Sequence, residues 1–288
     1  MKYSYFPGCT LKTKAKGFED SALAVAKALD FEMIELPHWY CCGTSFSLIK
    51  DNVMAFSAPV RNLLQAQKEK SDLTTLCSFC YNTLKRANEV MRKDAEKRKK
   101  LSDFIEEEYQ GEVKVLHLLE ILKNQIGFED LKKKVKKSLK GLKVASYYGC
   151  LLLRPQEEIG LDNAENPQIL ENLLTALGAE VVDFPHKTEC CGSFQMLNSP
   201  EVAADCSHLI LRSALKNGAE LVIGSCPLCQ YNLDTRQKLI KERHQDFSEI
   251  PVLYFTQLLG IALGADSSSF AFEKHYVDPR PVLQKKQL

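Results

Sequence analysis

The chain has 288 residues, of which 45% are apolar and 26% are charged, as in ordinary soluble proteins. Its net charge of +1 excludes an electrostatic case for nucleic acid as the main partner. No apolar run approaches the roughly 20 residues that span a bilayer, and the start, MKYSYFPGC, lacks the features of a secretory signal. We therefore expect a cytoplasmic protein that has no membrane span and binds no nucleic acid.

Strands and helices are predicted to alternate along the first half of the chain. The evidence is a series of short apolar runs for strands and an apolar stripe at helical spacing, formed by Phe18, Ala22, Val25 and Leu29. In chain order the segments are strand 2–9, helix 18–29, strand 31–37, helix 52–67, strand 73–77, a helix that opens at 77–80, and a closing segment 113–122.

The second half repeats this order. Its segments are strand 143–150, helix 166–178, strand 179–185, helix 199–218, strand 220–226, a helix that opens at 226–229, and a closing segment 250–259. Alternating strands and helices predict an α/β fold, here two pseudo-symmetric repeated units with largely parallel sheets and flanking helices. In such folds binding groups collect after the carboxyl ends of the strands.

Four regions follow from this pattern: an N-terminal repeat over 1–127, a connector over 128–141, a C-terminal repeat over 142–265 and a tail over 266–288. Leu131, Val135 and Leu139 give the lysine-rich connector a thin apolar stripe. We interpret it as a solvated amphipathic connector rather than a docking site for an acidic partner. The tail is polar and punctuated by proline, so we expect it to lie over the surface.

Cysteines carry the strongest signal in the chain. There are eleven, and since disulfides are uncommon in a reducing cytosol, clustered cysteines there indicate metal or redox chemistry. Ten of them form two sets of five, one in each half: Cys9, Cys41, Cys42, Cys77 and Cys80, and Cys150, Cys190, Cys191, Cys226 and Cys229.

The two sets are related by a constant shift in the sequence. The last four members of each set lie 149 residues apart (190 − 41, 191 − 42, 226 − 77, 229 − 80), and the first members lie 141 apart (150 − 9). The second half therefore has eight additional residues between its first cysteine and its cysteine pair. We expect this insertion within 151–167.

Adjacent cysteines are poorly placed for a disulfide with each other, because closing that ring strains the peptide between them. A glycine follows each pair and permits a tight turn that directs both sulfurs into one pocket. A structural zinc site and a cubane four-iron cluster each take four ligands. Five thiolates in each half suit a larger or less regular iron–sulfur assembly better, in which adjacent thiols ligate two different irons.

At this point the pattern resembles a known family. The spacings C-x(31)-C-C-G-x(34)-C-x-x-C and C-x(39)-C-C-G-x(34)-C-x-x-C match the double CCG motif of the B-type subunit of heterodisulfide reductase, over essentially the whole chain. The segments PGCT, CSFCYNTLKRAN and KHYVDPRP are also similar to that family. The resemblance implies two non-cubane 4Fe–4S clusters, with all ten repeat cysteines as ligands.

The resemblance also implies an activity and partners. The chain is expected to be the catalytic iron–sulfur subunit of a heterodisulfide reductase-type complex, an oxidoreductase that reduces a mixed disulfide to two thiols in a pocket between the clusters. Electrons would come from a flavin-containing A-type subunit through a small ferredoxin-like C-type subunit. The chain itself shows neither a G-x-G-x-x-G after a strand nor a P-loop.

Several residues have less certain roles. His38 and His186 precede the two cysteine pairs and are candidate catalytic groups that bond cluster sulfur or supply protons, although ordinary loop histidines explain them equally well. Lys12 and Arg154 place positive charge near the expected pocket, and we favour solvated loop positions for them. Cys206 has no counterpart in the first half and is interpreted as a packed thiol on an apolar helical stripe.

Two other functions remain open at this stage. One is a CCG-type iron–sulfur subunit of a lactate, glycolate or quinone-linked dehydrogenase. The other is a zinc-stabilised binding module without a redox role, which the C-x-x-C pairs also permit.

Overall fold

The computed structural model describes residues 1–43 and 53–288 of the chain. Two four-stranded sheets, with orders β2-β1-β3-β4 and β6-β5-β7-β8, contain only parallel pairings. The strands are β1 Lys2–Tyr5, β2 Glu32–Glu35, β3 Leu73–Thr75, β4 Val115–His117, β5 Lys143–Ser146, β6 Glu180–Val182, β7 Leu221–Gly224 and β8 Val252–Tyr254. The identical strand order confirms the predicted α/β fold with two pseudo-symmetric units.

Helices flank both sheets. In the first repeat and the connector they are α1 Gly8–Leu11, α2 Lys16–Ala28, α4 Ser57–Lys68, α5 Ser78–Lys93, α6 Ala95–Ile105, α7 Leu118–Ile121 and α8 Phe128–Lys133. In the second repeat and the tail they are α9 Gln156–Ile159, α10 Ile169–Ala176, α11 Pro200–Lys216, α12 Pro227–Thr235, α13 Gln237–Arg243, α14 Phe255–Leu263 and α15 Arg280–Lys285. Shorter 3-10 or π turns are η1 Val53–Phe56, η2 Leu122–Ile126, η3 Ser193–Gln195, η4 Ser267–Ser269 and η5 Phe272–Lys274.

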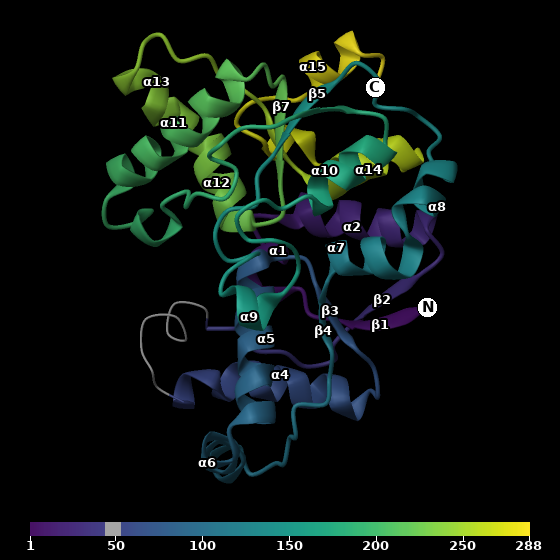
Figure 1. Cartoon of the computed structure of the whole chain (residues 1–288), viewed down its shortest axis with the longest axis vertical. Coiled ribbons are helices and arrows are strands. Elements are labelled where there is room, and N and C mark those ends of the chain that lie inside the picture. Colours follow the sequence, from purple (N-terminus) through teal and green to yellow (C-terminus); the bar gives the residue numbers. More distant parts are fainter. Residues whose placement is uncertain (44–52) are drawn as a thin grey trace.

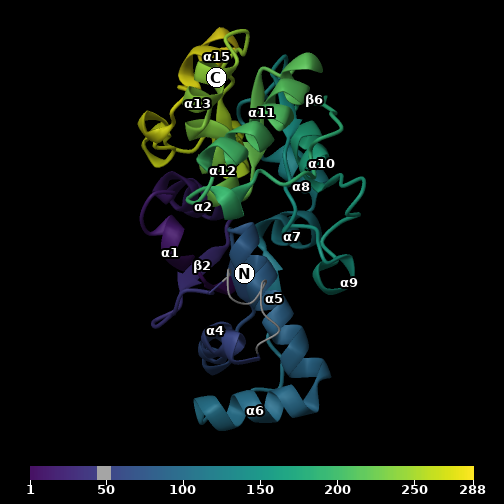
Figure 2. The same cartoon turned by 90° about the vertical axis from the view of Figure 1, so that its left-hand side faces the viewer.

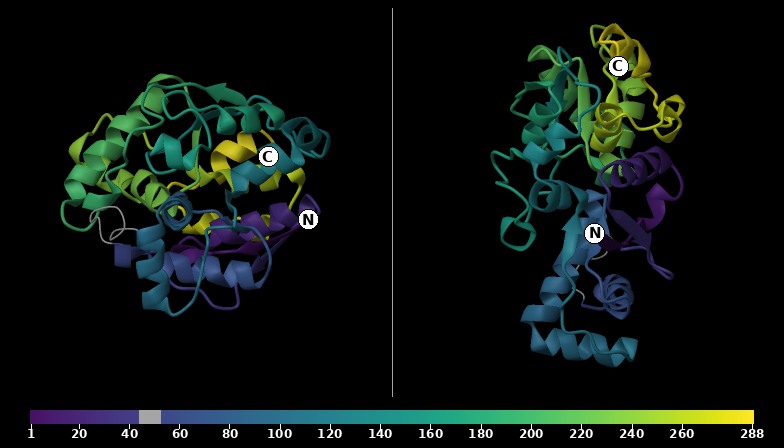
Figure 3. Two further views of the ribbon diagram at one scale, coloured as in Figure 1. Left: turned by 60° about the horizontal axis from the view of Figure 1, so that its bottom comes forward. Right: turned by 90° about the vertical axis from the view of Figure 1, so that its right-hand side faces the viewer.

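The two repeats are stacked end to end (Figure 1). Helices α4 and α6 of the first repeat lie at one end of the molecule, and the C-terminal tail with α15 lies at the other (Figures 2 and 3). The central strands β3 and β7 are fully buried, as expected for parallel strands covered on both faces. This arrangement leaves the carboxyl ends of both sheets to face the middle of the molecule.

Helix α2 joins the repeats by packing against α14 of the second repeat. The predicted apolar stripe of α2 is buried as expected. Phe18 from this stripe stacks on Tyr254, with ring centroids 4.3 Å apart and planes within 3°. Ser21 and Thr256 share a buried hydroxyl hydrogen bond of 2.7 Å. The apolar face of α2 therefore belongs to the interface between the repeats.

His117, at the end of β4, holds the residue that precedes Cys77. Its Nδ1 accepts from the Leu119 N–H at 3.2 Å, so Nε2 carries the proton and donates to the Leu76 carbonyl at 2.8 Å. Burial lowers the pKa of His117 to about 4, which keeps the ring neutral at neutral pH. At the equivalent end of β8, the Tyr254 N–H donates to the Gln257 side chain at 2.8 Å, as the His117 N–H donates to Glu120 at 2.8 Å.

Strand register locates the insertion of the second repeat. Lys2 pairs with Glu32, and Lys143 pairs with Glu180. The shift between the repeats is thus 141 at the first strand (143 − 2) and 148 at the second (180 − 32). Seven of the eight additional residues lie between β5 and β6, and the eighth lies between β6 and the cysteine pair, outside the expected range of 151–167.

The tail is more firmly packed than the sequence predicts. Phe270 and Leu283 are each only 3% exposed. Gly260 on α14 makes room for Phe270, because a Cβ atom there would lie 2.6 Å from its ring. The His275 ring contacts the Val252 carbonyl at 3.0 Å and the Gln257 amide at 2.9 Å. The expectation of a surface tail is therefore wrong for these residues, since α14 needs an apolar cover on its outer face.

The connector also docks. Helix α8 ends at Lys133, and the backbone N–H groups of Lys136 and Lys137 then donate to the Ala262 carbonyl at 2.8 and 3.0 Å. Leu131 and Leu139 are fully buried. The predicted stripe thus covers the second repeat while the lysines between its members stay exposed.

We predict that Phe270→Ala lowers the free energy of unfolding by about 3–5 kcal/mol, because it removes a buried aromatic ring and leaves a cavity on α14. The matched control is Phe104→Ala on α6, where the ring is 58% exposed and the change should stay within about 0.5 kcal/mol. Denaturant unfolding measures both. Equal effects in the two variants would show that the tail does not cover α14.

Candidate functional site

All ten repeat cysteines follow the carboxyl ends of strands. Cys9 and Cys150 come after β1 and β5, the cysteine pairs come after β2 and β6, and each C-x-x-C comes after β3 or β7. Because the strands are parallel, these loops lie at one edge of each sheet. Cys80 and Cys229 lie in the first turns of α5 and α12, whose N-terminal dipoles favour thiolates.

The N-terminal set, Cys9, Cys41, Cys42, Cys77 and Cys80, comes together in sulfur pairs. The Sγ atoms of Cys41 and Cys9 are 3.9 Å apart, and those of Cys42 and Cys80 are 3.6 Å apart. Cys42, Cys77 and Cys80 are buried, whereas Cys9 and Cys41 are exposed. Three thiols of the set are therefore buried, and the other two are accessible to solvent.

The C-terminal set, Cys150, Cys190, Cys191, Cys226 and Cys229, has the same form. The Sγ atoms of Cys191 and Cys229 are 3.4 Å apart, and the Gly192 N–H donates to the Cys190 sulfur at 3.4 Å. The neighbouring Cys150 thiol, together with the backbone N–H groups of Gly192 and Ser193, lowers the pKa of Cys190 to about 6.

The donor sets fit a thiophilic metal assembly. Two thiolates on one tetrahedral metal atom lie about 3.8 Å apart, from metal–sulfur bonds of about 2.3 Å, and the observed sulfur pairs span 3.4 to 3.9 Å. Across residues 1–43 and 53–288, no three His, Cys, Asp or Glu side chains converge as a site for one ion.

Glycines shape both sites. The CCG glycines Gly43 and Gly192 have φ of +66° and +76°, in the left-handed region that favours glycine. Sequence reasoning missed the second pair, Gly8 and Gly149. A Cβ atom at these positions would lie 2.9 Å from the Cys80 sulfur and 3.3 Å from the Cys229 sulfur. The signal was present in the sequence, since a glycine precedes the first cysteine of each set.

The two repeats hold the same backbone carbonyl in different ways. In the first, the carbonyl before the cysteine pair belongs to Tyr40 and accepts from the Asn62 amide on α4 at 2.9 Å. In the second, that carbonyl belongs to Glu189 and accepts from the Tyr147 hydroxyl, just after β5, at 2.7 Å. Each donor fixes the approach of the chain to its cysteine pair.

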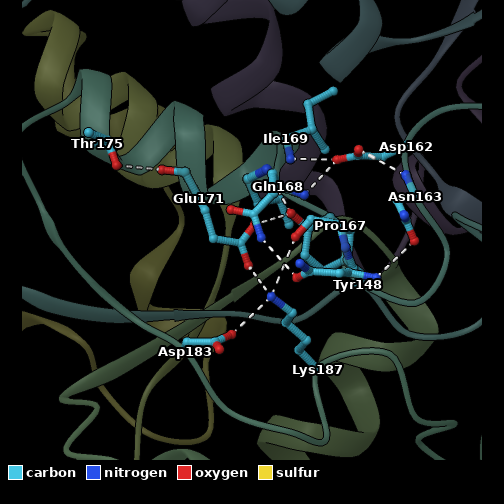
Figure 4. A network of polar contacts seen from close by, with 12 residues as sticks. Tyr148, Asp162, Asn163, Pro167, Gln168, Ile169, Glu171, Thr175, Asp183 and Lys187 are labelled. Carbon is cyan, nitrogen blue, oxygen red and sulfur yellow. Dashed lines mark hydrogen bonds and ion pairs between the residues drawn. The ribbon is translucent and has the colours of Figure 1, made fainter.

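A buried polar network supports the loops of the C-terminal set (Figure 4). The Lys187 ammonium contacts Glu171 at 3.1 Å and Asp183 at 2.9 Å, and the Tyr148 hydroxyl donates to Glu171. The Lys187 carbonyl accepts from the N–H groups of Tyr148 and Gly149. Lys187 therefore ties the loop before Cys150 to the loop before Cys190.

A cavity of about 410 Å³ lies against the N-terminal set. Residues of both repeats line it, and every described lining side chain is uncharged. Apart from the five cysteines, they are Thr10, Gly43, Phe79, Ser193, Phe194, Met196, Leu197, Asn198 and Leu228. The rings of Phe79 and Phe194 lie 5.7 Å apart and tilted by 49°. The cavity is thus largely apolar and lies beside the thiols of the N-terminal set.

The two predicted catalytic histidines, His38 and His186, lie outside the described lining of this cavity. His38 is exposed. His186 is half-buried, and its Nδ1 has no hydrogen-bond partner within the described part of the chain. Their catalytic role stays a prediction.

The two cations near the first cysteines are engaged in structural contacts. Lys12 pairs with Glu19 and Glu35, and Arg154 contacts Glu165 at 3.1 Å and the Thr188 carbonyl at 3.2 Å. They anchor loops instead of entering the described cavity lining.

Cys206 lies on α11 and is half-buried. Its sulfur is 3.4 Å from the position that a Gly192 Cβ atom would take. It therefore packs beneath the turn of the second CCG motif.

Comparison with known proteins identifies the family that has this arrangement of cysteines. The family model described as the CCG cysteine-rich domain matches residues 3–85 and 144–234. The chain belongs to the CCG family. The first matched segment contains the five cysteines of the N-terminal set, and the second contains the five of the C-terminal set.

Two curated relatives match nearly the full chain. One is the 8-methylmenaquinol:fumarate reductase membrane anchor subunit of Wolinella succinogenes, 34% identical over 96% of this chain and 97% of its own length. The other is the B-type subunit of the Ferredoxin/F(420)H(2)-dependent CoB-CoM heterodisulfide reductase of Methanosarcina acetivorans, 31% identical over 99% of this chain and 96% of its own length. The resemblance to the B-type subunit of heterodisulfide reductase is thereby confirmed.

A solved structure shares the fold. It is the crystal structure of a hypothetical protein from Helicobacter pylori, with a TM-score of 0.77 and 14% identity. The match covers 96% of this chain, which spans about half of that protein (51%). None of the helices in the described part of this CCG protein is both long and apolar enough to cross a membrane.

We predict that Lys187→Met lowers the free energy of unfolding by about 3 kcal/mol, because it leaves the Glu171 carboxylate buried without its cation. Lys187→Met combined with Glu171→Leu should recover most of the loss. The control, Lys241→Met, breaks a surface pair with Glu249 and should cost at most about 1 kcal/mol. Denaturant unfolding is the measurement. A double variant no better than the single one would contradict a role for the buried pair.

Proposed function

We propose that this CCG protein is the iron–sulfur subunit of a heterodisulfide reductase-type complex and reduces a disulfide to two thiols. The observation that carries the proposal is the pairing of two five-cysteine sets at the carboxyl ends of two equivalent sheets, one of them beside a largely apolar cavity. Thiolates select soft or borderline metals, and sets of five suit a non-cubane 4Fe–4S cluster in each repeat. Bound there, the clusters would supply single electrons and a thiophilic metal.

The side chains and helix termini of the protein would exclude water, orient the substrate and stabilise negative charge on the ligating sulfurs. The apolar lining, including Phe79 and Phe194, keeps water away from the reacting sulfurs. The polar groups of Thr10, Ser193 and Asn198 line the same chamber and can orient a substrate. The dipoles at the N-termini of α5 and α12 stabilise the negative charge on the ligating sulfurs.

Partners follow from what the chemistry requires. Cleavage of a disulfide consumes two electrons, and both cysteine sets are assigned to the reacting centres. Electrons therefore come from outside, in this proposal from a small ferredoxin-like C-type subunit and, through it, from an A-type flavoprotein. The similarity to the B-type subunit of a heterodisulfide reductase supports this.

A second function is favoured by a specific observation. The described cavity lining is uncharged and mostly apolar, which suits the head of a quinol better than a strongly anionic disulfide. The relative that is 34% identical is named for 8-methylmenaquinol:fumarate reductase. A quinone-linked iron–sulfur subunit is therefore the alternative to be tested.

The first test is iron content. Anaerobically purified protein should hold about eight irons, four in each repeat. Cys42→Ser and Cys191→Ser should each disturb one cluster, because each removes a buried thiol paired with a C-x-x-C cysteine. Cys206→Ser is the control and should keep its iron. Zinc without iron in the parent protein would instead establish the zinc-stabilised module.

The second test is turnover with a reduced low-potential dye as electron donor. Parent protein should cleave a small mixed disulfide, whereas Cys42→Ser should lose at least about a hundredfold, as expected for loss of an essential group beside the cavity. A menaquinone analogue serves as the competing substrate. Rapid quinone reduction without disulfide cleavage would replace the first function by the second.

A further inference from the structure

A side chain of the first repeat holds the turn that follows Cys150 in the second. Asn82 lies on α5, two residues after Cys80, and is fully buried. Its amide nitrogen donates to the backbone carbonyls of Leu151 and Arg154, at 2.8 and 2.7 Å. A buried contact therefore runs from one repeat to the segment that carries the first cysteine of the other repeat's set.

The contact requires an amide at this position. The side-chain NH2 group of Asn82 has two hydrogens, and each of the two carbonyls takes one. Turning the amide over would set its oxygen against two carbonyl oxygens. An ionised aspartate has nearly the same shape but only accepts hydrogen bonds, so it would leave both carbonyls without this donor. The chemistry of the side chain, and not only its volume, decides whether the turn is held.

The held turn supports two cysteines of the C-terminal set. The Arg154 N–H donates back to the Cys150 carbonyl at 3.1 Å. The Arg154 guanidinium donates to the Thr188 carbonyl at 3.2 Å, two residues before Cys190. By fixing the backbone at Arg154, Asn82 thus supports the segments that present Cys150 and Cys190.

Further contacts of α5 extend this interface. Arg86, one turn after Asn82, pairs with Glu158 on α9 at 3.2 Å, and the Tyr81 hydroxyl donates to the Ile159 carbonyl at 3.4 Å. Helix α9 belongs to the segment between β5 and β6, which contains seven of the eight additional residues of the second repeat. The longer loop of the second repeat therefore rests on a helix of the first.

The support runs in one direction. The residue equivalent to Asn82 in the second repeat is Tyr231 (82 + 149). Its side chain is 38% exposed and lies under the Arg236 guanidinium, 5.5 Å from the ring centroid. In the first repeat the Cys9 carbonyl accepts from the Thr13 hydroxyl at 3.1 Å. The turn after Cys9 is thus held from within its own repeat.

We propose that Asn82 is a positioning residue for the C-terminal cysteine set, which it completes from the first repeat by holding Cys150 in place. The inference rests on the proposed function in one respect, that this set holds a metal centre. Retention of metal by the second repeat then depends on a side chain outside its own sheet and its own CCG motif.

The structure contains a matched control on the same helix. Asn88 is also buried on α5, at 9% exposure, and its amide nitrogen donates to the Val113 carbonyl at 2.8 Å. Val113 belongs to the first repeat and lies just before β4. Asn88→Asp therefore removes a comparable donor from α5 without touching the turn after Cys150.

The experiment compares Asn82→Asp with Asn88→Asp, each combined with Cys42→Ser or with Cys191→Ser so that the remaining iron reports one set. With Cys42→Ser, Asn82→Asp should release iron at about tenfold lower concentration of the iron chelator ferrozine, as for loss of a group that supports a ligand. With Cys191→Ser it should release iron as its parent does, and Asn88→Asp should change neither background. Asn82→Ala, which removes both donors without adding charge, should act in the same direction.

A second readout needs no metal. In metal-free protein, iodoacetamide should alkylate Cys150 about tenfold faster in Asn82→Asp, relative to Cys9 as internal reference, because two hydrogen bonds that hold the turn are lost. Parental alkylation of Cys150, or equal loss of iron in the two backgrounds, would overturn the proposal. Failure of the proposed function is distinguishable, since alkylation depends on neither iron nor turnover.

Discussion

Parallel pairing of β1 with both β2 and β3, and of β5 with both β6 and β7, is the constraint on which the site depends. It brings the loops that follow these strands to one edge of each sheet, so cysteines far apart in the sequence become neighbours. Cys42 and Cys80 are separated by 38 positions and have sulfurs 3.6 Å apart. The packing of α2 on α14 then places the two edges toward each other.

Much of this could be predicted from the sequence, because the duplication is written in cysteine spacing. The shift of 149 residues locates the second pair and the second C-x-x-C, and the alternation of strands and helices gives the fold class. Periodicity also identified the buried face of α2. These features depend on local pattern and on residue type, which a single sequence records directly.

Other features depend on contacts that no local pattern reports. The burial of Phe270 follows from the small size of Gly260 on a distant helix. The single additional residue after β6 becomes visible only through strand register. Lys187 resembles a surface lysine in the sequence, yet its ammonium is held inside a network with Glu171 and Tyr148. Each is a long-range pairing in which one partner gives no sign of the other.

The carbonyl before each cysteine pair has a different donor in each repeat, which shows how the duplicated halves have diverged. Asn62 reaches it from a helix, and Tyr147 reaches it from the end of a strand. The duplicated halves therefore keep the same ligand geometry while the scaffolding beneath it has been exchanged. A hybrid chain that swaps one loop between the halves would inherit the cysteines but lose the support, since neither donor has its equivalent in the other half. The two repeats share their fold and the positions of their cysteines, but they differ in the residues that support the cysteine pairs.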